Sequence, residues 1–101
     1  MSAMTTKKRL KAMVVDDTVF YRKIVSDALA AIPEVEVVGT ANNGKIALSR
    51  IATLQPDLIT LDIEMPEMTG LEVLAAIKER SLNVAVVMLS SITEQGIHMT
   101  I

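Results

Sequence analysis

The sequence predicts an α/β fold, a doubly wound parallel sheet with helices on both faces. Short apolar runs alternate with longer segments whose apolar residues recur at helical spacing, and this β-then-α pattern repeats about four times. The apolar runs lack a polar face, which is typical of strands that are buried on both sides. Because crossovers between parallel strands are right-handed, these repeats leave few other arrangements.

The first expected strand covers residues 12–15 and ends abruptly at Asp16 and Asp17. Thr18 can cap the helix that follows, and Pro33 closes it. The residues of this helix that we expect to face inward are Ile24, Val25, Ala28, Leu29 and Ile32.

Three further units share the same design, a short apolar strand followed by a helix. The third helix has the clearest start, because Thr69 and Glu72 have the spacing of a capping box. The third strand ends at Asp62 and the fourth at Ser90. The expected strands are 35–40, 58–61 and 85–89, and the expected helices are 44–54, one that begins at Thr69 and one that begins at Thr93, within which the sequence ends.

Length and composition indicate one domain of 101 residues, with a flexible N-terminal lead over 1–9 and the domain over 10–101. The net charge of -2 argues against nucleic acid or an anionic membrane as a partner. The absence of cysteine excludes disulfides, thiolate metal sites and thiol nucleophiles. Since no apolar run resembles a signal peptide or a membrane span, we expect a cytoplasmic protein.

Polar residues end three of the four expected strands: Asp16 with Asp17, Asp62, and Ser90. The carboxyl ends of parallel strands meet at one edge of the sheet, so we expect one crevice to hold them all. Three carboxylates repel one another unless a cation neutralises them, and Mg²⁺ prefers oxygen ligands. A remaining carboxylate would be able to attack a phosphoryl donor and form an acyl phosphate, while the hydroxyl of Ser90 hydrogen-bonds a phosphoryl oxygen.

Three ordered motifs resemble the signature of response-regulator receiver domains, the CheY-like family. They are Val-Val-Asp-Asp at 14–17, Leu-Asp-Ile-Glu-Met-Pro at 61–66 with Thr-Gly-Leu at 69–71, and Val-Val-Met-Leu-Ser at 86–90. The resemblance covers about residues 10–94. It implies a flavodoxin-like sheet with strand order 2-1-3-4-5.

The resemblance also implies a role for each candidate residue. Asp16 and Asp17 would bind Mg²⁺, and Asp62 would join them at the metal and accept a phosphoryl group from a sensor histidine kinase. Glu64 would offer its backbone carbonyl to the metal, and Ser90 would be the switch hydroxyl. Segments 60–66 and 88–91 are most similar to the receiver of chemotaxis methylesterases. Their hydrolase domain has no counterpart in these residues, so we do not expect an enzyme.

A complete receiver has five βα units, and about four are expected here. The family's phosphate-pairing lysine and aromatic switch residue belong to the fifth unit, and every lysine of this sequence precedes Ser90. The fourth strand is therefore expected to be an uncovered apolar edge, and part of the first helix's apolar stripe is expected to be bare. Such surfaces favour a homodimer, joined through the fourth strand or the surface that the last helix would cover.

Two other functions stay open. A binding or oligomerisation platform that accepts no phosphoryl group is favoured by the missing lysine, and it would not respond to a phosphoryl donor or to beryllofluoride. A phosphatase of the haloacid dehalogenase type is suggested by residues 13–19, but the second aspartate that this family needs falls on Thr18. A dinucleotide or flavin binder is disfavoured because no glycine-rich turn follows the first strand.

The single histidine, His98, is expected at the surface.

Overall fold

The structure is a computed structural model that describes residues 8–90 and 99–100. Strands and helices alternate through most of the chain, as the sequence predicts. In chain order the elements are β1 (Leu10–Val15), α1 (Val19–Ala30), β2 (Val35–Ala41), α2 (Gly44–Leu54), β3 (Leu58–Asp62), α3 (Gly70–Glu79), β4 (Ala85–Leu89) and β5 (Met99–Thr100).

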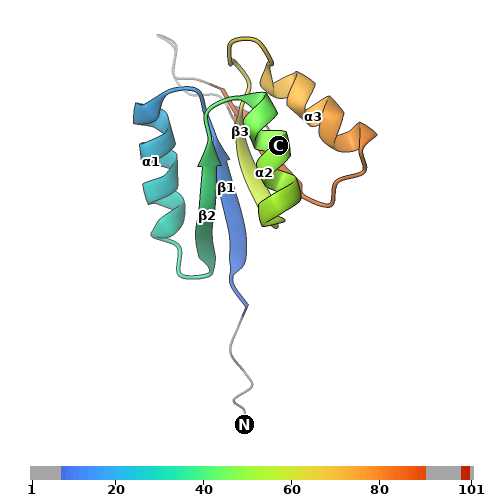
Figure 1. The fold of residues 1–101 in the computed structure, drawn as a ribbon. Helices are drawn as coiled ribbons and strands as arrows, with labels where there is room; N and C mark the ends of the chain where they lie inside the picture. Colours follow the sequence, from blue (N-terminus) through green and yellow to red (C-terminus); the bar gives the residue numbers. More distant parts are fainter. Residues whose placement is uncertain (1–7, 91–98, 101) are drawn as a thin grey trace.

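The strands form a single sheet in the order β2-β1-β3-β4-β5. The first four are parallel, which confirms the predicted α/β class and the flavodoxin-like order up to β4. Three helices flank this sheet, with α1 on one face and α2 and α3 on the other (Figure 1). No helix among the described residues has both the length and the apolar composition needed to cross a membrane.

The outer edge of β4 is partly covered by another strand, contrary to the prediction. Met88 and Leu89 pair with Thr100 and Met99 of β5, which runs antiparallel. The predictions that β4 is an uncovered edge and that the chain ends in a helix are therefore wrong at these residues, because unpaired strand groups accept any extended segment that reaches them. The rest of the helix expected from Thr93, including His98, lies outside the described residues.

The main core lies between the sheet and the pair of helices α2 and α3. The side chains that fill it come from alternate positions of β1 and β3 and from one stripe of each helix. Met13 and Met88 belong to it, as expected of flexible core-filling side chains. The most deeply buried members are Met13, Val15, Ala41, Ala47, Ile59, Leu61 and Val73.

The other face of the sheet is covered less completely. Helix α1 packs along β1 and β2 and has no buried residue. Val19 is 72% exposed, Phe20 66%, Ile24 45% and Ile32 42%. The prediction that Ile24, Ala28 and Ile32 face inward is wrong, because helical periodicity identifies an apolar stripe but not what covers it. Ile32 also lies beyond the end of α1, whereas Val25 and Leu29 are half-buried. The prediction that part of this stripe is bare agrees with the structure.

A polar residue caps each helix, at Thr18 and Thr69 as the sequence predicts and also at Asn43. The Thr18 hydroxyl accepts a hydrogen bond from the Tyr21 N–H at 3.4 Å, and the Asn43 side chain accepts one from the Ile46 N–H at 2.8 Å. Thr69 caps α3 with a complete capping box, in which the Glu72 carboxylate accepts from the Thr69 N–H. These caps stabilise the ends of helices whose first residues follow the strand ends.

Helix α3 ends in a Schellman turn that normally contains glycine. The Ser81 N–H donates to the Lys78 carbonyl at 3.1 Å, and the Leu82 N–H donates to the Ile77 carbonyl at 3.0 Å. Ser81 has a φ of 53°, in the left-handed region that side chains disfavour. Serine is therefore a poorer residue than glycine at this position.

One buried hydroxyl lies in the middle of β3. Thr60 is 6% exposed and is paired in register with Val14 on one side and Val87 on the other. Among the described residues its hydroxyl has no hydrogen-bond partner. A buried polar group without a partner is destabilising.

Candidate functional site

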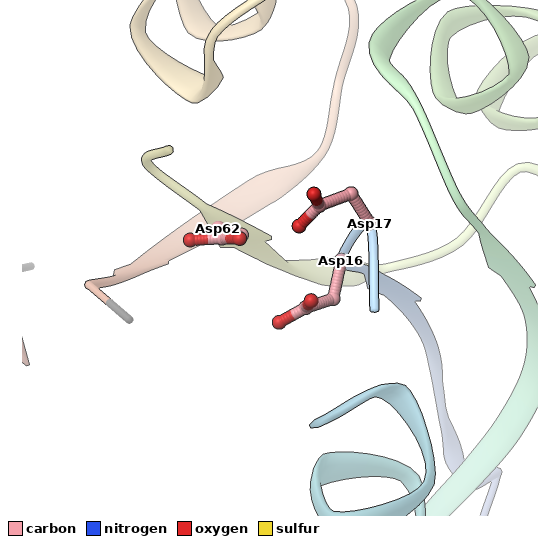
Figure 2. Close-up of side chains that lie close together, drawn as sticks. All are labelled: Asp16, Asp17 and Asp62. Carbon is pink, nitrogen blue, oxygen red and sulfur yellow. The ribbon is translucent and has the colours of Figure 1, made fainter. Parts of the chain in front are cut away.

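Three aspartates converge at the carboxyl end of the sheet. Asp16 and Asp17 directly follow β1, and Asp62 is the last residue of the neighbouring strand β3. One carboxylate oxygen from each lies within 4.8 Å of the others. Figure 2 shows the three side chains grouped around one space. Asp62 is only 3% exposed, whereas Asp16 and Asp17 are half-buried. The sequence argument from strand ends predicted this convergence.

The Asp16 carboxylate is held at the start of α1. Its Oδ1 accepts hydrogen bonds from the Thr18 N–H at 3.0 Å and from the Thr18 hydroxyl at 3.1 Å. The Asp16 N–H donates to the Ala41 carbonyl of β2, and the Arg22 guanidinium donates to the Asp16 carbonyl at 2.9 Å. Thr18 thus orients one carboxylate of the cluster and caps α1 as well.

The Asp62 carboxylate is oriented by the residue two positions further along the chain. Its Oδ1 accepts a hydrogen bond from the Glu64 N–H at 3.1 Å. The side chain of Glu64 itself is exposed. Between them, the Ile63 N–H donates to the Leu89 carbonyl of β4 at 2.9 Å, which anchors the start of the loop. Sequence reasoning singled out Glu64 only for its carbonyl, and it missed the contact made by its N–H.

Ser90 lies at the same edge of the sheet. Leu89 is the register partner of Asp62 in the β3–β4 pair, and Ser90 is the next residue. Ser90 is half-buried. Among the sequence-predicted site residues, therefore, Asp16, Asp17 and Asp62 form the cluster, while Glu64 and Ser90 flank Asp62 from the following loop and the adjacent strand.

A close backbone contact sets the path of the loop between β3 and α3. The N–H of Gly70 donates to the Ile63 carbonyl at 2.9 Å, and Gly70 is buried. A Cβ atom at Gly70 would collide with the Asp62 carbonyl oxygen and would lie 2.9 Å from the Ile63 Cα. Only glycine allows α3 to start this close to the end of β3. The sequence marked Gly70 as part of a motif but not as a contact of Asp62.

The donor set of the cluster fits a small, hard divalent cation. All three side chains offer carboxylate oxygens, the ligands that Mg²⁺ prefers, and they come from two rigid strand ends. Without a cation, the three negative charges repel one another at short range. The arrangement can therefore hold Mg²⁺ and present a buried, oriented carboxylate to an electrophile such as a phosphoryl group.

Most of the chain matches the model of one known protein family. Residues 12–100 match the family model described as the response regulator receiver domain. A protein-glutamate methylesterase/protein-glutamine glutaminase of Desulfotalea psychrophila is 56% identical over 93 residues, which cover 92% of this chain and 26% of that protein. The protein of the same name from Bacillus subtilis is 49% identical over 92 residues, covering 91% of this chain and 26% of the relative. The chain thus spans about a quarter of the length of these relatives.

Solved structures agree with the sequence matches. The response regulator domain of Thermotoga maritima CheB aligns with a TM-score of 0.78 and 39% identity, over 89% of this chain and 66% of that one. The CheX-CheY-BeF3-Mg+2 complex from Borrelia burgdorferi contains a chain that aligns with a TM-score of 0.77 and 30% identity, over 91% of this chain and 70% of that one.

Proposed function

This chain belongs to the response regulator receiver family, and from that premise we propose that it is a cytoplasmic phosphoacceptor which takes a phosphoryl group from a sensor histidine kinase onto Asp62. The observation that carries the proposal is a nearly buried carboxylate, oriented by the Glu64 N–H and surrounded by the carboxylates of Asp16 and Asp17. Asp62 is thereby distinguished from the many exposed acidic residues of the surface.

In the proposed reaction, an oxygen of the Asp62 carboxylate attacks the phosphorus atom of a phosphohistidine. The phosphorus–nitrogen bond breaks, the imidazole leaves with the bonding electron pair, and an acyl phosphate remains on Asp62. Bound Mg²⁺ would supply positive charge that offsets the negative charge of the phosphoryl oxygens. Asp16, Asp17 and Asp62 would hold it through carboxylate oxygens, and Glu64 would contribute its backbone carbonyl.

The remaining groups of the site have positioning roles in this proposal. The Glu64 N–H holds Oδ1 of Asp62, and Thr18 holds Oδ1 of Asp16, so two carboxylates do not need to reorient when the donor arrives. The hydroxyl of Ser90 would donate a hydrogen bond to a phosphoryl oxygen from the neighbouring strand. Such a bond would couple the modification of Asp62 to the end of β4.

We also propose that the pathway is chemotaxis. The supporting observation is that the two relatives named above are methylesterase/glutaminases with 56% and 49% identity, and the Thermotoga neighbour is the response regulator domain of CheB. Because the matched part is about a quarter of those proteins, the activity of a whole methylesterase is not assigned to these residues.

Beryllofluoride, an analogue of the phosphoryl group, tests the phosphoacceptor proposal. With Mg²⁺ present, we expect fluorine NMR to detect one bound beryllofluoride per chain and backbone NMR signals to shift at Asp62 and Ser90. Asp62→Asn removes the charged acceptor with little change in size and should abolish both effects. Binding of beryllofluoride to Asp62→Asn as tightly as to the parent chain would contradict the assignment.

A second candidate function is a binding platform that forms a homodimer. The specific observation in its favour is the bare stripe of α1, where Val19, Phe20 and Ile24 are each more than 40% exposed. A second copy packed on this stripe would cover the apolar surface with two-fold symmetry. Sedimentation of a dilute sample tests it: a dimer that Phe20→Ser dissociates supports the platform, and a compact monomer opposes it.

A further inference from the structure

An apolar groove lies beside the acidic cluster, on the loop that follows Asp62 and the first turn of α3. It has a volume of about 440 Å³. Leu71, at its side, is 60% exposed, which is high for a large aliphatic side chain. The groove is lined by Ile63, Glu64, Met65, Pro66, Thr69 and Leu71.

The backbone around this groove is firmly held. The Gly70 N–H donates to the Ile63 carbonyl, and the capping box between Thr69 and Glu72 fixes the first turn of α3 on either side of Leu71. Met65 is buried and anchors the middle of the loop in the core. Leu71 is therefore held at the surface, and the groove exists before any partner binds.

Carboxylates are concentrated along the segment that carries the groove, and one of them, Glu64, lines it. Between Asp62 and Ile77 the sequence has four carboxylates, Asp62, Glu64, Glu67 and Glu72, and no lysine or arginine. Glu64 and Glu67 are exposed, and within residues 8–90 neither forms an ion pair. Together with Asp16 and Asp17, they create a negative field that attracts a positively charged surface.

We propose that the groove receives an apolar side chain, flanked by lysine or arginine, of the protein that delivers the phosphoryl group. This inference rests on the proposed function. A donor that brings its phosphohistidine to Asp62 covers the loop that begins at Ile63, so the groove and the acceptor fall within the same contact area. The apolar anchor supplies affinity, and the basic residues match Glu64 and Glu67.

The test compares two donors for the same acceptor. The protein donor is the isolated, phosphorylated histidine domain of a chemotaxis kinase, and the small donor is acetyl phosphate, which needs no docking surface. For Leu71→Ser we expect transfer from the protein donor to slow about tenfold at subsaturating concentration, the usual loss for an interface anchor. Labelling by acetyl phosphate should stay within twofold of the parent chain, which also shows that the site is folded.

Two further variants sharpen the comparison. Leu10→Ser is a matched control, because Leu10 is 47% exposed but begins β1, at the opposite end from Asp16. It should leave transfer from both donors unchanged. Glu67→Gln should weaken the salt dependence of transfer from the protein donor, since one of the attracting charges is removed.

The outcomes separate this inference from the function on which it rests. If neither donor labels Asp62 in the parent chain, the phosphoacceptor proposal fails. If both label it and Leu71→Ser transfers normally, or slows equally with both donors, the docking inference is overturned while the proposed function stands. If Leu71→Ser accepts the phosphoryl group normally but sediments differently from the parent chain, the groove binds a second copy of this chain. That result also overturns the docking inference.

Discussion

Replacing Asp17 by asparagine removes one of the three negative charges of the cluster and keeps the size of the side chain. Asp17 suits this test because, within the described residues, its carboxylate accepts no hydrogen bond, whereas that of Asp16 holds Thr18. If the three carboxylates repel one another when no cation is bound, Asp17→Asn should make the metal-free protein more stable.

The size of this effect follows from the geometry. Two charges 4.8 Å apart, the upper limit for these oxygens, repel by about 0.9 kcal/mol in water and by about 3.5 kcal/mol at an effective dielectric constant of 20. Asp17→Asn removes two of the three pairwise repulsions. Because Asp16 and Asp17 are half-buried and partly screened, we expect a gain near the lower figure for each pair. This is about 2 kcal/mol in total, or a Tm higher by roughly 8–16 °C.

Magnesium should stabilise the parent chain more than Asp17→Asn. Ligand at 100 times its Kd stabilises a folded protein by about 2.7 kcal/mol, so Mg²⁺ should raise the Tm of the parent chain clearly. Asp17→Asn loses a proposed ligand and should respond little. The assay is thermal unfolding followed by circular dichroism, with EDTA and then with excess Mg²⁺.

A matched control comes from an acidic residue outside the cluster. Asp27 is 66% exposed and pairs with Lys23 at 3.2 Å on α1. Asp27→Asn should lower the stability by no more than about 0.5 kcal/mol and keep the full response to Mg²⁺. The reasoning is refuted if metal-free Asp17→Asn is no more stable than the parent chain, or if Mg²⁺ stabilises both chains equally.

Three other substitutions test the account of the fold. Gly70→Ala should lower the free energy of unfolding, measured in urea, by at least about 2 kcal/mol, because its Cβ meets the rigid Asp62 carbonyl. Gly39→Ala is the control, because its Cβ meets only a leucine methyl group. An equal loss of stability in Gly39→Ala would contradict this reasoning. Ser81→Gly should raise the free energy of unfolding by about 1 kcal/mol by relieving the left-handed φ, whereas Ser81→Ala should not. Thr60→Val should leave the free energy of unfolding unchanged or raise it by up to about 1 kcal/mol, since it removes a buried hydroxyl without a described partner. If thermal unfolding showed that the substitution lowers the stability by more than about 1 kcal/mol, the prediction would be wrong.

Much of the fold and of the acidic cluster is predictable because it depends on local patterns. The run at 85–89 and the capping-box spacing at Thr69 each mark an element whose bounds the structure reproduces closely. The convergence of Asp16, Asp17 and Asp62 follows from one rule, that parallel strands end at the same edge.

Features that depend on distant contacts were not predictable. The apolar spacing over α1 predicts the helix, but the exposure of Ile24 depends on which elements lie above it. The pairing of Met99 with Leu89 joins segments whose local sequence does not indicate a hairpin. The left-handed conformation of Ser81 and the approach of Gly70 to Asp62 are imposed by the loops around them, and neither residue type reveals its neighbour.

The central claim is that Asp62 accepts a phosphoryl group. Its most direct test is intact mass spectrometry of the purified chain after incubation with acetyl phosphate and Mg²⁺, followed by mapping of the modified peptide. We predict one phosphoryl adduct, located on Asp62, lost in Asp62→Asn and strongly reduced when EDTA removes Mg²⁺. An unmodified chain under these conditions, or an adduct that persists in Asp62→Asn, would contradict the claim.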